Sequence, residues 1–295
     1  MEQHIAPSNS EPRDPLLTRS PSTGIGDEYK IPPPASTSFS VLKDRIKQHY
    51  EICSDYYYSL WGEHIHHGYF LHPEDTKELA QTRLIDLLLE TSNLARGSSV
   101  LDVGCGIGGT TRYLAREKAC NVTGITISGQ QVKMARQLTA KEAASGGQDT
   151  DGATPVKLND GIVRYMELDA EKMGDFFNKA TFDAVWISEA MSHLPDKELF
   201  FRNAETLLKS GGKLVVADWF KGEDLTETQM DADIKPIEGQ GSSCPTVDIL
   251  LIVLEDGMLL PSLCTTSDYV QYAQQVGLKV FAKPIDISKE VSKTW

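Results

Sequence analysis

Apolar residues recur along this chain with two different periods, and the two periods alternate. Short runs of strand-type apolar residues predict strands at residues 99–104, 120–126, 162–168, 182–187 and 212–220. Apolar positions spaced three and four residues apart predict helices at residues 110–117, 129–143 and 196–208. Because strands that alternate with helices form a parallel sheet covered on both faces, we expect an α/β, doubly wound fold with a mostly parallel sheet.

The segments around this core have a different character. Residues 1–38 are rich in Ser, Pro and Thr and show no period, which predicts a disordered leader. An apolar face that starts near Phe39 predicts a helix running through residue 61, and a second helix is expected over 76–91. The Gly- and Asp-rich stretch 144–160 is predicted to be a surface loop.

Composition limits the partners that this chain can have. It has 295 residues and a net charge of −13, which argues against nucleic acid or an anionic membrane as the main partner. A small neutral or cationic molecule fits better. The five cysteines show no C-x-x-C spacing, so no zinc ribbon or disulfide framework is indicated. The longest apolar run, 249–254, is too short for a membrane span, and the acid-rich leader is a poor transit peptide, so we expect a cytoplasmic protein.

A glycine-rich run follows the first predicted strand and is suited to an adenosyl cofactor. Glycines let a ligand approach the backbone, and the next helix points free N–H groups at the same place. Gly104, Gly106 and Gly109 also match a dinucleotide fingerprint, which needs an acidic residue about 20 positions further on. The second strand ends at Thr126 without a carboxylate, which disfavours NAD. Asp102 could instead accept from the amine of S-adenosylmethionine; the alternative is a structural turn that binds no ligand.

Five motifs occur in order along the chain, at residues 50–70, 101–109, 124–128, 182–186 and 193–197. Together they resemble the class I S-adenosylmethionine-dependent methyltransferases of the γ-tocopherol and sterol C-methyltransferase group. That group is similar to cyclopropane-fatty-acid synthases and to plant and fungal alkaloid methyltransferases. The resemblance covers the chain from about residue 41 onward.

The resemblance implies a division of the chain around a Rossmann-like core. Residues 39–98 would form an N-terminal helical lid, 99–222 the S-adenosylmethionine-binding core, and 223–265 helices that cover the acceptor. Residues 266–295 would add a helix and a strand, the strand at Lys279 to Ile287. Family members continue through another helix and a final antiparallel strand, so we expect the C-terminal strand to be missing. Residues 236–256 fit the family poorly, and a retained intron or a faulty gene model is one hypothesis for them.

The same resemblance implies where the cofactor binds. The first motif would hold its methionine and ribose parts through Asp102, Gly104, Gly106 and Gly108. Thr126 and Gln131 match a pattern that replaces the usual ribose-binding acid, which accounts for the missing carboxylate.

Four further residues are expected at the cofactor. Asp169 is where the family holds the adenine amino group, although an ordinary exposed acid is the alternative. Ala170 next to it, Ser188 at the end of the fourth strand and Tyr50 in the lid complete the predicted contacts.

Two clusters in the lid segment have candidate roles. Aromatic faces stabilise a sulfonium cation, so a set of rings could form a lid and cage, although ordinary packing is the alternative: Tyr50, Tyr57, Trp61 and Tyr69. Four histidines invite a metal, but no cysteine or carboxylate completes a ligand set, and we predict no metal site: His64, His66, His67 and His72.

The fourth strand brings candidate catalytic residues to the carboxyl edge of the sheet, where open α/β sheets bind ligands. His193 is the candidate general base, because an imidazole pKa of about 6.5 suits proton removal near neutral pH. A structural histidine that caps the following helix is the alternative. Glu189 could steer a cationic acceptor or pair with a nearby cation. Tocopherol-type enzymes carry Glu-His where this chain has Ser192-His193, which disfavours carbon methylation.

Three functions follow from these residues. We expect an S-adenosylmethionine-dependent methyltransferase acting on O or N of a small, largely apolar natural product, such as an indole alkaloid or a phenolic secondary metabolite. A C-methyltransferase of a prenyl-lipid or sterol-like acceptor is the alternative within the same class. A catalytically weak, cofactor-binding accessory protein is the alternative from another class, suggested by the atypical stretch 236–256 and the early C-terminus.

Overall fold

The computed structural model describes residues 39–148, 150–235 and 260–294. The predicted leader and the stretch 236–256 lie outside the described residues. The helices and strands, in chain order, are α1 (Phe39–Trp61), α2 (Lys77–Ser92), β1 (Ser99–Val103), α3 (Gly109–Lys118), β2 (Asn121–Thr126), α4 (Gly129–Ser145), β3 (Val156–Leu158), β4 (Gly161–Glu167), α5 (Met173–Phe176), β5 (Phe182–Ser188), α6 (Lys197–Leu207), β6 (Leu208–Ala217), α7 (Glu227–Gln229), α9 (Thr266–Gln275) and α10 (Ser288–Val291). Single 3-10 or π-helical turns are η2 (Ala170–Lys172), η3 (Met191–His193), η4 (Met230–Ile234) and η5 (Ser292–Thr294).

The strands form one sheet in the order β3-β4-β2-β1-β5-β6. All neighbours run parallel except β3, which is antiparallel to β4. The chain builds outward from β1 through β2 to β4, and then returns to the other side of β1 to add β5 and β6. The strand order therefore reverses between β1 and β5, and open sheets of this kind bind ligands beyond the carboxyl ends of the strands at such a point. The predicted α/β, doubly wound sheet is confirmed.

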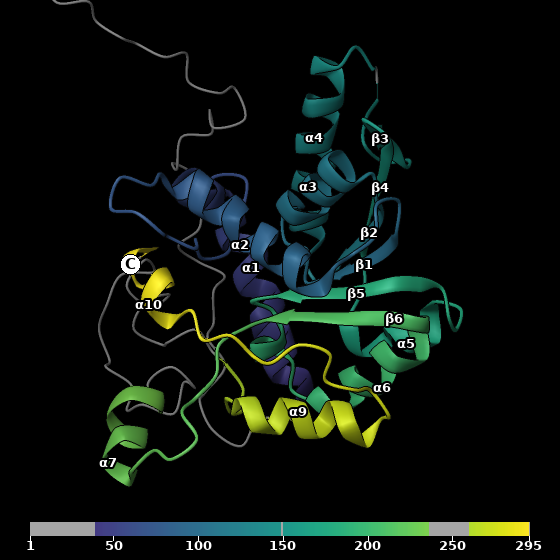
Figure 1. Cartoon of the computed structure of the whole chain (residues 1–295). Coiled ribbons are helices and arrows are strands. Elements are labelled where there is room, and N and C mark those ends of the chain that lie inside the picture. The colour runs from purple at the N-terminus through teal and green to yellow at the C-terminus, as the bar shows by residue number, and fades with distance from the viewer. Residues whose placement is uncertain (1–38, 149, 236–259, 295) are drawn as a thin grey trace, which may run out of the picture. The chain divides into compact units, whose positions relative to one another are not determined.

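Helices cover both faces of the sheet because its strands are apolar on both sides. Val100 of β1 lies in one buried cluster with Leu89 of α2 and Leu114 of α3. Its neighbour Leu101 lies in the other cluster, with Phe200 of α6 and Tyr269 of α9. Alternate residues of a strand point to opposite faces, so the two clusters are the two sides of the sheet. Figure 1 shows α3 and α4 on the opposite side of the strands from α6 and α9.

Side-chain caps fix where several helices begin. Thr76 accepts a hydrogen bond from Leu79 N at the start of α2, Ser128 accepts from Gln131 N at α4, and Asp196 caps α6. Such caps satisfy backbone N–H groups that have no partner within the helix. Within the described ranges, no helix is both long enough and apolar enough to cross a membrane.

Two predicted boundaries in the sheet are corrected. Within the stretch expected to be a loop, α4 continues to Ser145 and β3 forms a hairpin with β4, pairing Val156 with Val163. Its three residues are too few to show a strand period in the sequence. The predicted strand at 212–220 instead begins at Leu208, directly after α6, and its register against β5 shifts between Phe182 and Ala184. This irregularity adds three residues to β6, and no apolar period reveals it.

The strand predicted at Lys279 to Ile287 is wrong, because this segment has no regular secondary structure. The segment is rich in apolar residues, but Phe281 is 76% exposed and the segment pairs with no strand of the described sheet. A strand needs a neighbour for its backbone groups, and Pro284 has no N–H to donate.

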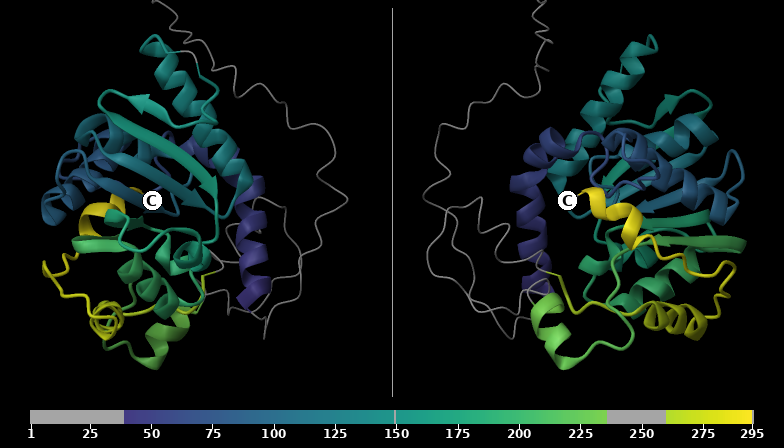
Figure 2. Two further views of the ribbon diagram at one scale, coloured as in Figure 1. Left: turned by 90° about the vertical axis from the view of Figure 1, so that its right-hand side faces the viewer. Right: turned by 60° about the vertical axis from the view of Figure 1, so that its left-hand side comes forward.

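The last described residues lie against the segment that precedes α2. Phe70 N donates to Glu290 O of α10 at 3.1 Å, and Gly68 N donates to Thr294 Oγ1 at 3.2 Å. The right view of Figure 2 shows α10, in yellow, beside this blue segment. Two segments that are more than 200 residues apart in sequence are therefore tied together.

Packing between α6 and the sheet generates a stability prediction. Phe200 is fully buried, so Phe200→Ala should lower the free energy of unfolding by about 3–5 kcal/mol through lost burial and a residual cavity. Phe176→Ala is the matched control, because that ring is 54% exposed and its loss should cost under about 1 kcal/mol. Urea unfolding measures both values. Equal losses would show that α6 does not pack on the sheet in this way.

Candidate functional site

The carboxyl end of β1 meets the carboxyl end of β5 at the point where the strand order reverses. β1 ends at Val103, and the turn from Gly104 to Gly108 leads into α3, with φ positive at Gly104, Gly106 and Gly108. A β-carbon at Gly104 would collide with the β-carbon of Ala190, which follows β5. The predicted glycine run is thus a tight turn wedged between two strand ends, as its composition indicates.

A small cleft of about 40 Å³ opens on this turn. Its lining includes the predicted Asp102, Gly104, Gly106 and Ser188, together with His64 and His66 from the segment after α1. That segment crosses the start of α3 closely, because a β-carbon on Gly109 would lie 2.7 Å from His64 Nδ1. The structure therefore adds two histidines to the predicted cofactor residues.

Asp102 is the charged group of this cleft. Its side chain is almost fully buried, and Thr111 Oγ1 donates to Oδ2 at 2.6 Å. Burial raises the pKa of Asp102 to about 6, and the hydrogen bond from Thr111 opposes this rise only in part. No lysine or arginine is among the residues that line the described cleft. The cleft therefore presents an unneutralised carboxylate that favours a cationic ligand.

Thr126 and Gln131, which are predicted to replace a ribose-binding acid, lie at the end of β2 and in the first turn of α4. Thr126 Oγ1 donates to Gln131 Oε1 at 2.6 Å, and Gln131 N donates to Ser128 Oγ at 3.1 Å. The two residues that the sequence predicts in place of a ribose-binding acid thus lie in contact with each other.

The loop after β4 places the predicted adenine residues beside α1. Asp169 Oδ1 accepts from Glu171 N, and its Oδ2 accepts from Lys43 Nζ of α1 at 3.0 Å. Ala170 follows at the start of η2. Lys43 also pairs with Glu171, so the lid helix is joined to this loop by charge. The sequence did not indicate Lys43, because its partners lie more than 120 residues away.

His193 forms a hydrogen-bonded pair with Tyr50. The Tyr50 hydroxyl lies 3.2 Å from His193 Nε2, and burial raises the pKa of this phenol well above its usual value, so the phenol keeps its proton. Burial lowers the pKa of His193 to about 4, with smaller effects from His49 and Lys197. His193 is therefore uncharged at neutral pH and a weaker proton acceptor than an ordinary histidine.

Glu189 forms a second pair, with His67. Its Oε1 accepts from His67 N at 2.9 Å, and His67 Nδ1 donates to its Oε2 at 2.6 Å. Although burial opposes ionisation, these hydrogen bonds and the nearby imidazole hold the pKa of Glu189 below its usual range. Glu189 also has a φ of +52°, an uncommon backbone conformation for a residue with a side chain. The sequence did not single out His67 beyond its place in a histidine-rich segment.

Asp218 is a third buried carboxylate, just past β6. Its two oxygens accept from Ser192 N at 2.8 Å and Trp219 N at 2.7 Å. Burial raises its pKa to about 6. A carboxylate therefore lies against Ser192, at the position where the sequence lacks the family's glutamate.

The aromatic residues of the predicted cage lie at different places in the structure. The rings of Tyr50 and Tyr57 lie 6.4 Å apart near His193, while Trp61 contacts the His67 ring edge-on at 5.5 Å. Tyr69 donates its backbone N–H to Ala80 O of α2. Among the residues that the structure describes, no group of three or more His, Cys, Asp or Glu side chains could hold a metal ion.

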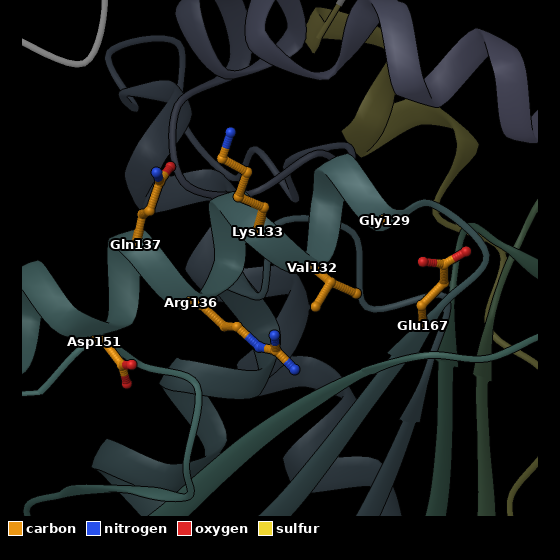
Figure 3. Close-up of a pocket in the computed structure, with 7 residues that line it drawn as sticks. All are labelled: Gly129, Val132, Lys133, Arg136, Gln137, Asp151 and Glu167. Carbon is orange, nitrogen blue, oxygen red and sulfur yellow. The ribbon is translucent and has the colours of Figure 1, made fainter.

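A larger hollow, of about 410 Å³, lies on α4. Figure 3 shows Lys133, Arg136 and Gln137 of α4 around it, with Glu167 at one side and Asp151 at the other. None of the predicted site residues lines this hollow. The larger hollow is therefore not the candidate site, because the predicted site residues lie around the glycine turn and not here.

Comparison with known proteins shows the family to which this chain belongs. The family model described as mycolic acid cyclopropane synthetase matches residues 41–238. The chain belongs to this family. The predicted class I, S-adenosylmethionine-dependent methyltransferase of the tocopherol-like group is thereby confirmed as the family, with S-adenosylmethionine as the cofactor.

Two curated relatives of this family member are methyltransferases by name. The 2-methyl-6-phytyl-1,4-hydroquinone methyltransferase of Synechocystis sp. is 40% identical over 172 residues, covering 56% of this chain and 47% of the relative. The chloroplastic tocopherol O-methyltransferase of Arabidopsis thaliana is 28% identical over 274 residues, covering 88% of this chain and 70% of the relative. The chain thus spans about half the length of the Synechocystis relative.

Among solved structures, the crystal structure of the [4+2]-cyclase SpnF resembles this chain with a TM-score of 0.64. It is 23% identical, and the match covers 84% of this chain and 77% of the cyclase. At this identity the likeness shows the shared fold alone.

The pKa of Asp102 predicts how the affinity for the family's cofactor depends on pH. A carboxylate attracts a ligand's ammonium fully only when it is ionised, and burial raises the pKa of Asp102 to about 6. Affinity for S-adenosylhomocysteine should therefore fall as the pH drops below about 6, approaching tenfold per pH unit. Isothermal titration calorimetry from about pH 5 to about pH 8 measures this fall.

Asp102→Asn is the control for this titration. The variant should bind more weakly than the wild type at about pH 8 and show a nearly flat profile, because the amide does not titrate in this range. If Asp102→Asn keeps the wild-type pH profile, another group, such as Asp218, carries the titration.

Proposed function

We propose that this chain is an S-adenosylmethionine-dependent methyltransferase that methylates O or N of a small, largely apolar acceptor, such as an indole alkaloid or a phenolic secondary metabolite. The observation that carries this proposal is the junction at the end of β5. Ser188 lines the cofactor cleft, and the next residue, Glu189, holds His67 through two hydrogen bonds. The methyl donor would thus lie next to the Glu189–His67 pair, which would accept a proton, because Ser188 and Glu189 are consecutive residues.

The cofactor would be held by the residues around the glycine turn. Asp102 fits the ammonium, because it is a buried carboxylate in a cleft without a cationic side chain. The remaining proposed contacts are Gly104, Gly106 and Gly108 for the methionine and ribose, Thr126 and Gln131 for the ribose hydroxyls, and Asp169, Ala170, Ser188 and Tyr50 around the rest of the molecule. When bound, S-adenosylmethionine supplies an electrophilic methyl group on a sulfonium centre.

The protein's own contribution is to orient the acceptor, exclude water and accept a proton. Glu189 fixes the His67 ring through Nδ1, and this pair is the proposed acceptor of the proton. The bound cofactor would supply the methyl group, and the His67–Glu189 pair would take the proton that the acceptor's oxygen or nitrogen loses. His193, the base predicted from sequence, would act with Tyr50 in positioning, since its pKa of about 4 makes it a weaker proton acceptor than an ordinary histidine.

Carbon methylation of a prenyl-lipid or sterol-like acceptor is the second candidate, and the relatives support it at least as well. One curated relative is named for a phytyl-hydroquinone acceptor and the other for tocopherol, so both names support this class of acceptor, although the second is named an O-methyltransferase. The sequence argument against carbon methylation is the serine at position 192. Asp218 weakens that argument, because its carboxylate accepts from Ser192 N at 2.8 Å.

A cofactor-binding accessory protein with little activity remains the alternative from another class. It depends on residues 236–256, which lie outside the described residues. We also propose a cytoplasmic location, supported by the acid-rich composition of residues 1–38.

Product analysis separates these functions. The full chain is incubated with methyl-labelled S-adenosylmethionine and a panel of phenols, hydroxyindoles, amines and prenylated hydroquinones, and the products are identified by mass spectrometry and NMR. Label on O or N supports the leading proposal, whereas label on ring carbon supports the second candidate. Binding of S-adenosylhomocysteine without any labelled product would overturn the methyltransferase in favour of the accessory protein.

Glu189 provides a kinetic prediction. Glu189→Gln removes the charge that fixes His67, so kcat should fall by about 10²-fold or more, while the Kd for S-adenosylhomocysteine changes less than about twofold. Glu198→Gln, on the exposed surface of α6, is the matched control and should leave both values unchanged. A Glu189→Gln variant that loses cofactor affinity and keeps its kcat would place Glu189 in the cofactor site instead.

A further inference from the structure

His66 is a buried histidine that the proposed reaction does not use. Its side chain is 6% exposed and lines the same cleft as Asp102 and Ser188. Its ring lies 5.1 Å from that of His64, centroid to centroid. The two histidines enter the cleft from the segment after α1, opposite the glycine turn.

The hydrogen bonds of His66 fix its tautomer. Nδ1 lies 2.8 Å from the carbonyl oxygen of His67, and a carbonyl oxygen only accepts, so Nδ1 carries the hydrogen. Burial lowers the pKa of His66, although Glu189 opposes this, so the ring is uncharged at neutral pH. An uncharged imidazole with its hydrogen on Nδ1 has a bare lone pair on Nε2.

That lone pair has no partner. His66 Nε2 is a buried nitrogen without a hydrogen-bond donor in the described structure. Leaving a buried acceptor unpaired is costly, so its presence in a cleft indicates that a ligand supplies the donor. The same cleft holds the Asp102 carboxylate, whose partner is the Thr111 hydroxyl. The Asp102 carboxylate and His66 Nε2 thus share one small cleft whose lining has no lysine or arginine.

We propose that His66 Nε2 accepts a hydrogen bond from the α-ammonium of S-adenosylmethionine, beside Asp102. An ammonium has three N–H donors and a positive charge, and the pair of acceptors matches both. Asp102 provides the opposite charge, while the uncharged His66 provides direction. This inference rests on the proposed function, because it requires S-adenosylmethionine in this cleft.

Ligands that differ only at the amino group test this role directly. Calorimetry compares S-adenosylhomocysteine, its analogue without the α-amino group, and 5′-methylthioadenosine, which lacks the whole amino-acid part. His66→Ala should weaken S-adenosylhomocysteine binding by about 10- to 100-fold, because a hydrogen bond to a charged group is lost. It should change the affinity for the two ligands without the ammonium by less than about twofold.

Two further variants make the result specific. His66→Gln should recover most of the affinity for S-adenosylhomocysteine, because its amide oxygen is again an acceptor. His72→Ala removes an exposed histidine of the same segment and should bind all three ligands like the wild type. Melting temperatures measured without ligand check that each variant is folded. If His66→Ala is not folded, the comparison rests on His66→Gln and the wild type.

The outcomes distinguish this inference from the proposed function. If His66→Ala weakens all three ligands equally, or leaves S-adenosylhomocysteine binding unchanged, His66 does not bind the ammonium, although the cofactor assignment stands. If the wild type binds no S-adenosylhomocysteine, the proposed function itself is overturned, and this inference with it.

Discussion

The close approach of two strand ends is the constraint on which the rest of this structure depends. No side chain fits between Gly104, after β1, and Ala190, after β5. The glycine turn and the end of β5 therefore lie against each other, and the residues proposed to bind the cofactor and to accept a proton are held at one place. The parallel sheet supplies this proximity, because its strands end on the same edge and reverse order between β1 and β5.

Buried acids dominate the electrostatics of this place. Asp102 and Asp218 both have a pKa raised to about 6 by burial, and Glu189 stays ionised through its contacts with His67. Carboxylates are costly to bury, and a site that buries three of them gains most from a ligand that brings positive charge. The sulfonium and ammonium groups of the family's cofactor are such charges.

Much of the fold and part of the site could be predicted from sequence. The helix and strand periods identify most elements of the core, because both faces of the sheet are apolar. The glycine run and Asp102 can also be recognised in the sequence, because they lie close together along the chain. The hairpin strand β3 is too short to show a period, and the strand expected at Lys279 to Ile287 fails because the sheet offers it no partner. The pairs Glu189 with His67 and Asp169 with Lys43 join residues more than 120 positions apart, and no local pattern reveals such contacts.

The contacts of the last described residues have a thermodynamic consequence. Thr294 and Glu290 hold the backbone of Gly68 and Phe70, directly after the histidine segment that closes over the glycine turn. Any ligand that orders this segment therefore also stabilises the end of the chain, and by linkage the reverse holds with equal free energy. Protection of amide hydrogens in α10 would then report on the occupancy of a site several elements away.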